Sequence, residues 1–66
     1  MILEFPVNDG KNTCGIDIYS IYAVLPNYSD NNCCTIITSY GSELGRVQIS
    51  LSVKDAISII NDANHA

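Results

Sequence analysis

Hydroxyl, thiol, imidazole and carboxylate side chains all occur in this chain, so nucleophilic catalysis is the first chemistry to consider. A Ser-His-Asp triad needs an imidazole held rigidly between the other two side chains. The single histidine is His65, near the end of the chain, where a backbone usually frays, and no G-x-S-x-G elbow presents a serine to it. A Cys14–His65 pair meets the same objection. We therefore expect no catalytic residue, and a protein that is not an enzyme.

The cysteines Cys14, Cys33 and Cys34 could in principle bind metal or form disulfides. Neighbouring residues on a strand point to opposite faces, so Cys33 and Cys34 do not suit one disulfide framework. Zinc sites of the C-x-x-C type need a second matching pair, which this sequence lacks. We expect buried structural thiols, no metal and no cofactor, in a cytoplasmic protein. A reactive or metal-binding thiol, or an intermolecular bridge, is the alternative.

Phosphate and nucleic-acid chemistry finds little support in the sequence. The four glycines form neither of the glycine-rich patterns that cradle phosphates. Only Lys11, Arg46 and Lys54 are basic, against seven acidic residues, which gives a net charge of −4. Nucleic-acid backbones and anionic membranes require clustered cations. We expect no direct contact with either, and an acidic surface that favours solubility, with DNA mimicry as a weaker alternative.

The composition indicates a folded protein with more apolar surface than its small core can bury. With 47% apolar and 15% charged residues, the chain is not of the disordered class. A domain of 66 residues buries only about 60% of the surface that its unfolded chain exposes. No apolar run approaches the ~20 residues of a membrane span, and no signal peptide is evident. We expect a single domain over 1–66.

Hydrophobic periodicity and turn residues then predict the elements. Alternation and β-branched residues predict strands within 2–51, and an amphipathic stripe after Ser52 predicts a helix over 53–64. The expected strands cover 2–7, 13–16, 21–25, 33–40 and 46–51, with a tight turn at 8–11, a helical turn at 17–20 and loops at 26–32 and 41–45. The helix stripe is Val53, Ala56, Ile57, Ile60 and Ala63. This order predicts an α+β fold, a small antiparallel sheet of three to five strands with the helix packed on one face.

Strand parity divides the apolar residues between two faces of that sheet. The set expected to face the helix is Leu3, Phe5, Val7, Ile21, Ala23, Leu25, Ile36, Val47, Ile49 and Leu51. The set expected to face away from it is Ile2, Tyr22, Val24 and Ile37. Four solvent-exposed apolar side chains would lower the stability of so small a domain, so we predict that this second face mediates self-association. A homodimer or a higher homo-oligomer is expected.

Polar loops supply candidate residues for binding a partner or ligand. Tyrosine combines apolar area with a hydrogen-bonding tip and is enriched at interfaces. Tyr28, in the middle of a polar loop, is the hardest aromatic residue to explain as core. The candidates are Tyr28, Tyr40, Asn31, Asn32, Ser42 and Arg46.

A likeness to one family accompanies these patterns. The residues that carry it are the Asn8-Asp9-Gly10-Lys11 turn, Ile16 with Ile21 and Val24, Pro26, Asp30, Thr35-Ile36-Ile37, Gly41, Val47, and Ser52 with Ile57. In this order the chain resembles the short flagellar FlbD-like proteins, from which the asparagine-rich loop at 26–32 and the loop at 41–45 depart. The resemblance implies the fold pattern and leaves the flagellar role open.

Three functions follow as hypotheses. The first is a small non-enzymatic protein that binds and inhibits or regulates a bacterial protein partner, in the manner of phage-encoded anti-defence or anti-CRISPR proteins; it rests on analogy of size and charge. The second is an oligomeric sponge for a signalling nucleotide, with Arg46 and Lys11 as the cations available for phosphate. The third is an FlbD-like flagellar accessory regulator.

Overall fold

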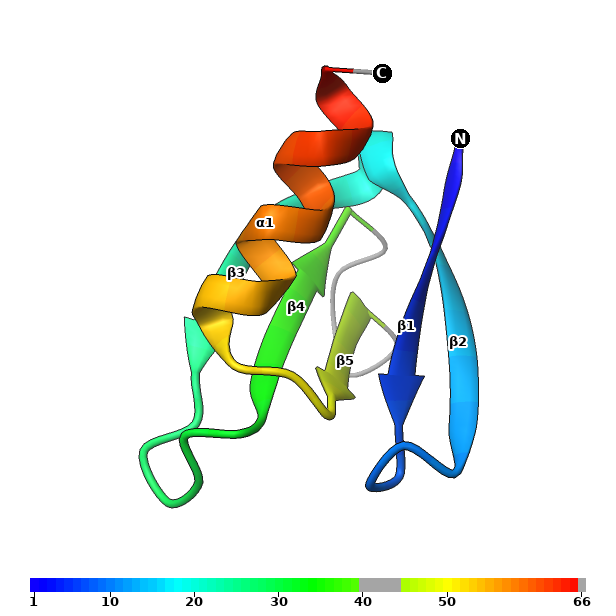
Figure 1. The fold of residues 1–66 in the computed structure, drawn as a ribbon. Coiled ribbons are helices and arrows are strands. Elements are labelled where there is room, and N and C mark those ends of the chain that lie inside the picture. The colour runs from blue at the N-terminus through cyan, green and yellow to red at the C-terminus, as the bar shows by residue number, and fades with distance from the viewer. Residues whose placement is uncertain (40–44, 66) are drawn as a thin grey trace.

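The computed structural model describes residues 1–39 and 45–65 (Figure 1). Within these residues the elements are β1 (Ile2–Val7), β2 (Asn12–Asp17), the 3-10 helix η1 (Ile18–Ser20), β3 (Ile21–Pro26), β4 (Cys34–Thr38), β5 (Arg46–Ile49) and α1 (Val53–Asn64). The predicted α+β class is confirmed. The strands form two antiparallel sheets, β1-β2 and β3-β4-β5, rather than one.

The β1–β2 hairpin follows from its turn residues. Asn8, Asp9 and Gly10 all have positive φ, at 53°, 56° and 83°, which Asn, Asp and Gly tolerate better than other residues. The Gly10 N–H donates to the Val7 carbonyl at 3.1 Å and the Lys11 N–H to the Asn8 carbonyl at 3.0 Å. The predicted turn is therefore confirmed.

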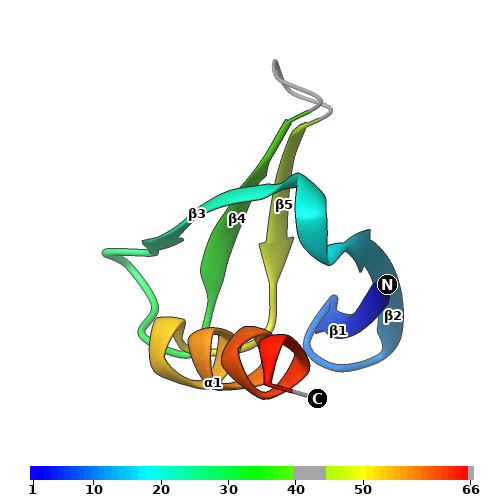
Figure 2. The same ribbon diagram turned by 90° about the horizontal axis from the view of Figure 1, so that it is seen from above.

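The hairpin stands beside β5, at the opposite side of the three-stranded sheet from β3 (Figure 2). The Ser50 N–H donates to the Pro6 carbonyl at 2.8 Å, and the Ser50 hydroxyl accepts from the Asp9 N–H at 2.9 Å. Ser50, just after β5, therefore joins the two sheets through its backbone and its side chain together.

Helix α1 begins and ends where the sequence predicts. Ser52 is the N-cap, and its hydroxyl accepts the Asp55 N–H at 3.2 Å, one of the N–H groups that a helix start leaves without a partner. The helix covers one face of the β3-β4-β5 sheet (Figures 1 and 2). Ala56 is fully buried. Ile57 was expected in the apolar stripe but is 42% exposed. It lies about 100° around the helix axis from the buried Ala56. Ile59 packs against the core instead.

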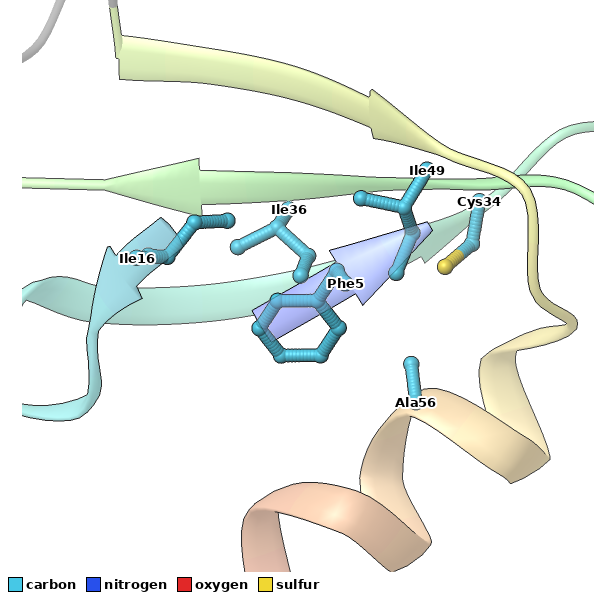
Figure 3. Close-up of a cluster of buried hydrophobic side chains, with 6 residues drawn as sticks. All are labelled: Phe5, Ile16, Cys34, Ile36, Ile49 and Ala56. Carbon is cyan, nitrogen blue, oxygen red and sulfur yellow. The ribbon is translucent and has the colours of Figure 1, made fainter. Parts of the chain in front are cut away.

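One small core joins both sheets and the helix. The buried cluster consists of Phe5, Ile16, Cys34, Ile36, Ile49 and Ala56 (Figure 3). Phe5, Ile36 and Ile49 were expected to face the helix, and all three are fully buried. Leu3, Val7, Ile21, Val47 and Leu51 pack against the cluster, as predicted.

The predicted parity of β3 is wrong beyond its first residue. Ile21 pairs with Thr38 but Ala23 pairs with Ile37, so Tyr22 is an extra residue in the strand, a β-bulge. Residues directly opposite share a face. Val24, opposite the buried Ile36, therefore faces the helix and packs against the core.

The same bulge turns the two neighbours of Val24 away from the helix. Ala23 and Leu25, which were expected to face it, lie opposite Ile37 and Thr35 on the outer face. Leu25 is accordingly 44% exposed.

The bulge can be tested with glutamate at two neighbouring positions that it places on opposite faces of β3. Val24→Glu puts a charge against the core, so we expect the free energy of unfolding to fall by about 2–4 kcal/mol. Leu25→Glu, one residue away on the outer face, should lower it by less than about 1 kcal/mol. Urea titration of dilute protein, followed by circular dichroism, measures both values. Equal losses, or a larger loss for Leu25→Glu, would contradict the bulged register.

The N-cap gives a second comparison. Ser52→Ala removes the hydroxyl that accepts the Asp55 N–H, and we expect it to destabilise the protein by about 1 kcal/mol. Ser58→Ala is the control, because Ser58 is exposed in the middle of α1 and alanine favours a helix interior. Thermal unfolding should separate the two variants, with Ser58→Ala at or above the wild-type midpoint.

Candidate functional site

The four residues expected to form one self-association face do not lie on a common face. Val24 packs toward the helix. Ile2 is 63% exposed but belongs to β1, in the other sheet. Ile37 is half-buried on the outer face of β4, and Tyr22, in the bulge, is 74% exposed. Self-association stays a prediction, but it needs a different surface.

The candidate ligand residues are not gathered either. Tyr28, Asn31 and Asn32 lie in the loop between β3 and β4, which enters β4 at Cys34. Arg46 pairs with Ile37, three residues further along β4, or about 10 Å of strand. Tyr40 and Ser42 lie outside the described residues. A nucleotide site that uses Tyr28 and Arg46 together therefore gains no support from their placement.

The loop between β3 and β4 is ordered by side chains that imitate backbone turns. The Asn27 side-chain oxygen accepts the Ser29 N–H at 2.9 Å, and the Asp30 carboxylate accepts the Asn32 N–H at 2.8 Å. Such Asx turns fix a loop without a core. Two backbone bonds of 3.3 Å, from the Asp30 N–H to the Asn27 carbonyl and from the Cys33 N–H to the Asp30 carbonyl, complete it.

Tyr28 projects from this ordered loop with 95% of its surface exposed. The side chain therefore contributes little to the packing of its own chain. Because the flanking backbone is already fixed, covering the ring costs little additional loop entropy. The loop can therefore offer one aromatic ring and one phenol hydroxyl to another molecule.

A second feature is an apolar groove of about 280 Å³ between the edge strand β3 and helix α1. It is lined by Ile21, Tyr22, Ala23, Val24, Ile57, Ile60 and Asn61. Sequence reasoning missed this groove, because both the bulge at Tyr22 and the exposure of Ile57 depend on how the helix meets the sheet.

All three cysteines are free thiols. Burial raises the pKa of Cys14 and of Cys34. Partial burial also raises the pKa of Cys33, and the Asp30 carboxylate, 3.5 Å from its sulfur, raises it further. The thiolate is the reactive form, so these surroundings suppress reactivity near neutral pH.

The described part of the chain contains neither a metal-ligand cluster nor a membrane-spanning helix. Across residues 1–39 and 45–65, no three His, Cys, Asp or Glu side chains cluster as metal ligands would. In the same residues no helix is long and apolar enough to cross a membrane.

Comparisons with protein-family models, with curated proteins and with solved structures found no significant match to this chain. The features of this chain that bear on its function are therefore the loop between β3 and β4, the groove between β3 and α1, and the surface residues.

The Cys33–Asp30 contact predicts a change in thiol reactivity. Asp30→Asn keeps a side-chain oxygen for the Asn32 N–H but removes the charge that raises the Cys33 pKa. A lower pKa means more thiolate at neutral pH, so we expect Cys33 to be alkylated several-fold faster. Mass spectrometry after timed iodoacetamide treatment measures this rate. The buried Cys34 and an Asp62→Asn variant are the controls, and an unchanged or slower rate at Cys33 would contradict the contact.

Proposed function

We propose that this chain is a small non-enzymatic protein that binds a bacterial protein partner and inhibits or regulates it, in the bacterial cytoplasm. A phage-encoded anti-defence protein of the anti-CRISPR kind is the form that fits its size and acidity. The observation that carries the proposal is Tyr28, which is 95% exposed on a loop held by Asn27 and Asp30. Fixed, exposed tyrosines are the side chains on which protein interfaces concentrate their binding energy.

The chemistry of the loop favours a protein over a small charged ligand. Around Tyr28 the loop offers carboxylate and amide groups, and its one charged residue, Asp30, is acidic. A phosphate would meet no cation from this loop. An interface of standard size instead needs an aromatic anchor with a polar rim, which Tyr28 with Asn31 and Asn32 can supply.

Self-association is part of the same proposal. Seven large apolar side chains of the described residues are exposed: Met1, Ile2, Tyr19, Tyr22, Leu25, Tyr28 and Ile57. For a domain with so small a core, covering some of them against a second copy is a direct source of stability.

Affinity capture with two matched tyrosine variants tests the partner proposal. Immobilised protein should recover one stoichiometric protein from bacterial lysate, whose binding is then titrated. Tyr28→Ala should weaken that binding about 30-fold, as expected for a hot-spot tyrosine worth about 2 kcal/mol. Tyr19→Ala, which also removes an exposed ring, should leave it unchanged. Failure to recover a stoichiometric partner, or equal affinity of the two variants, would contradict the proposal.

A further inference from the structure

The edge of β3 is the open end of the three-stranded sheet. β3 is an end strand with β4 on one side, so part of its backbone N–H and C=O groups point to the other side without a strand to pair with. The other end of this sheet differs, because β1 approaches β5 and the Pro6 carbonyl accepts the Ser50 N–H there at 2.8 Å.

The flank of the β3 edge is apolar and uncharged. The strand residues Ile21–Pro26 include no charged side chain, and neither does the lining of the groove between β3 and α1. Tyr22, Leu25 and Ile57 are 74%, 44% and 42% exposed beside it. The free edge of β2 is different, since half of the residues of Asn12–Asp17 are polar and the strand ends in a carboxylate.

We propose that β3 is the self-association surface: the β3 edge of one chain pairs antiparallel with the β3 edge of a second copy across a two-fold axis. This inference rests on the self-association proposed above and specifies its geometry. The two backbones pair with each other, and Tyr22, Leu25 and Ile57 are covered in the contact.

Charge indicates where a second copy can approach this chain. Two chains that each carry −4 repel one another over most of their surfaces. The β3 edge with its groove is a stretch where both surfaces are neutral, so two copies can approach there without bringing carboxylates together. A strand edge is also its own complement when it pairs antiparallel about a two-fold axis.

A stable dimer must bury more area than the edge of β3 alone provides. An interface of standard size removes about 800 Å² from each partner, roughly a sixth of the 4553 Å² surface of the described chain. A short strand edge does not supply that much. The contact must extend over the groove and reach Ile57 on the helix.

The irregular ends of β3 limit the pairing to one arrangement. The bulge at Tyr22 interrupts the ladder at one end, and Pro26 has no N–H to donate at the other. Only Ala23–Leu25 is left as regular strand. Because both copies use the same edge, the contact closes as a dimer and does not continue into a fibre.

Matched lysine variants test the proposed surface. Lysine on an edge strand opposes strand pairing, and across a two-fold axis two lysines repel. Wild type should have twice the monomer mass by light scattering at micromolar concentration. Tyr22→Lys should be monomeric under the same conditions, and Leu25→Lys is a second variant in case Tyr22→Lys does not fold by circular dichroism. Tyr28→Lys makes the same change on a tyrosine that is more exposed, 95% against 74%, and that does not line the groove, and it should remain dimeric.

Hydrogen exchange distinguishes this surface from any other dimer contact. Amide protection in Ala23–Leu25 should rise with protein concentration in wild type, whereas protection in β2 should not change. A dimer that persists in both lysine edge variants, or β3 protection that does not depend on concentration, would overturn the β3 surface and leave self-association standing. A wild-type protein that is monomeric throughout would overturn both.

Discussion

Burial of Phe5 is the contact on which the rest of the fold depends. Its ring lies between the three-stranded sheet and helix α1, beside Ile36, Ile49 and Ala56 (Figure 3). A two-stranded hairpin such as β1–β2 is only marginally stable in water, and a three-stranded sheet with one exposed face gains little alone. Through Phe5, the β1–β2 hairpin packs into the core between the three-stranded sheet and helix α1. Ala56 fits this arrangement because its small side chain lets the helix backbone come close to the ring.

Hydrogen bonds hold together parts of the structure that lie outside the apolar core. Ser50 ties β5 to the hairpin through its N–H and its hydroxyl. The buried hydroxyls of Ser20 and Thr38 donate to the carbonyls of Asp17 and Gly45, so their burial leaves no polar atom without a partner. The two Ser50 bonds secure the side of the sheet at β5. No comparable backbone bond from the described residues covers the outer edge of β3, which is where the groove lies.

Local chemistry explains which features could be predicted from the sequence. The turn at Asn8–Gly10 and the cap at Ser52 were predictable because each is determined by a few neighbouring residues whose conformational preferences are strong. Tyr28 was predictable as an exposed side chain because its neighbours are turn formers. The bulge at Tyr22 was not, since it depends on how β3 aligns with β4 across a long loop. That one residue reversed the faces of Ala23, Val24 and Leu25. Ile2 was separated from the other expected self-association residues for a different reason, because β1 belongs to the other sheet.

The bulge also connects the core to the surface. By turning Val24 toward the helix it adds an apolar side chain to a core with few members, and by the same rotation it turns Leu25 outward. The fold does not bury both, because neighbouring strand residues point to opposite faces and helix α1 covers a single face of this sheet (Figure 2). Part of the exposed apolar area lies at β3 and Ile57, beside backbone groups of β3 that have no strand to pair with. Any ligand or second copy that covered this edge would stabilise the folded chain in proportion to the logarithm of its concentration. Domains of this size are typically stabilised by only a few kcal/mol, so such binding would add substantially to the stability of the fold.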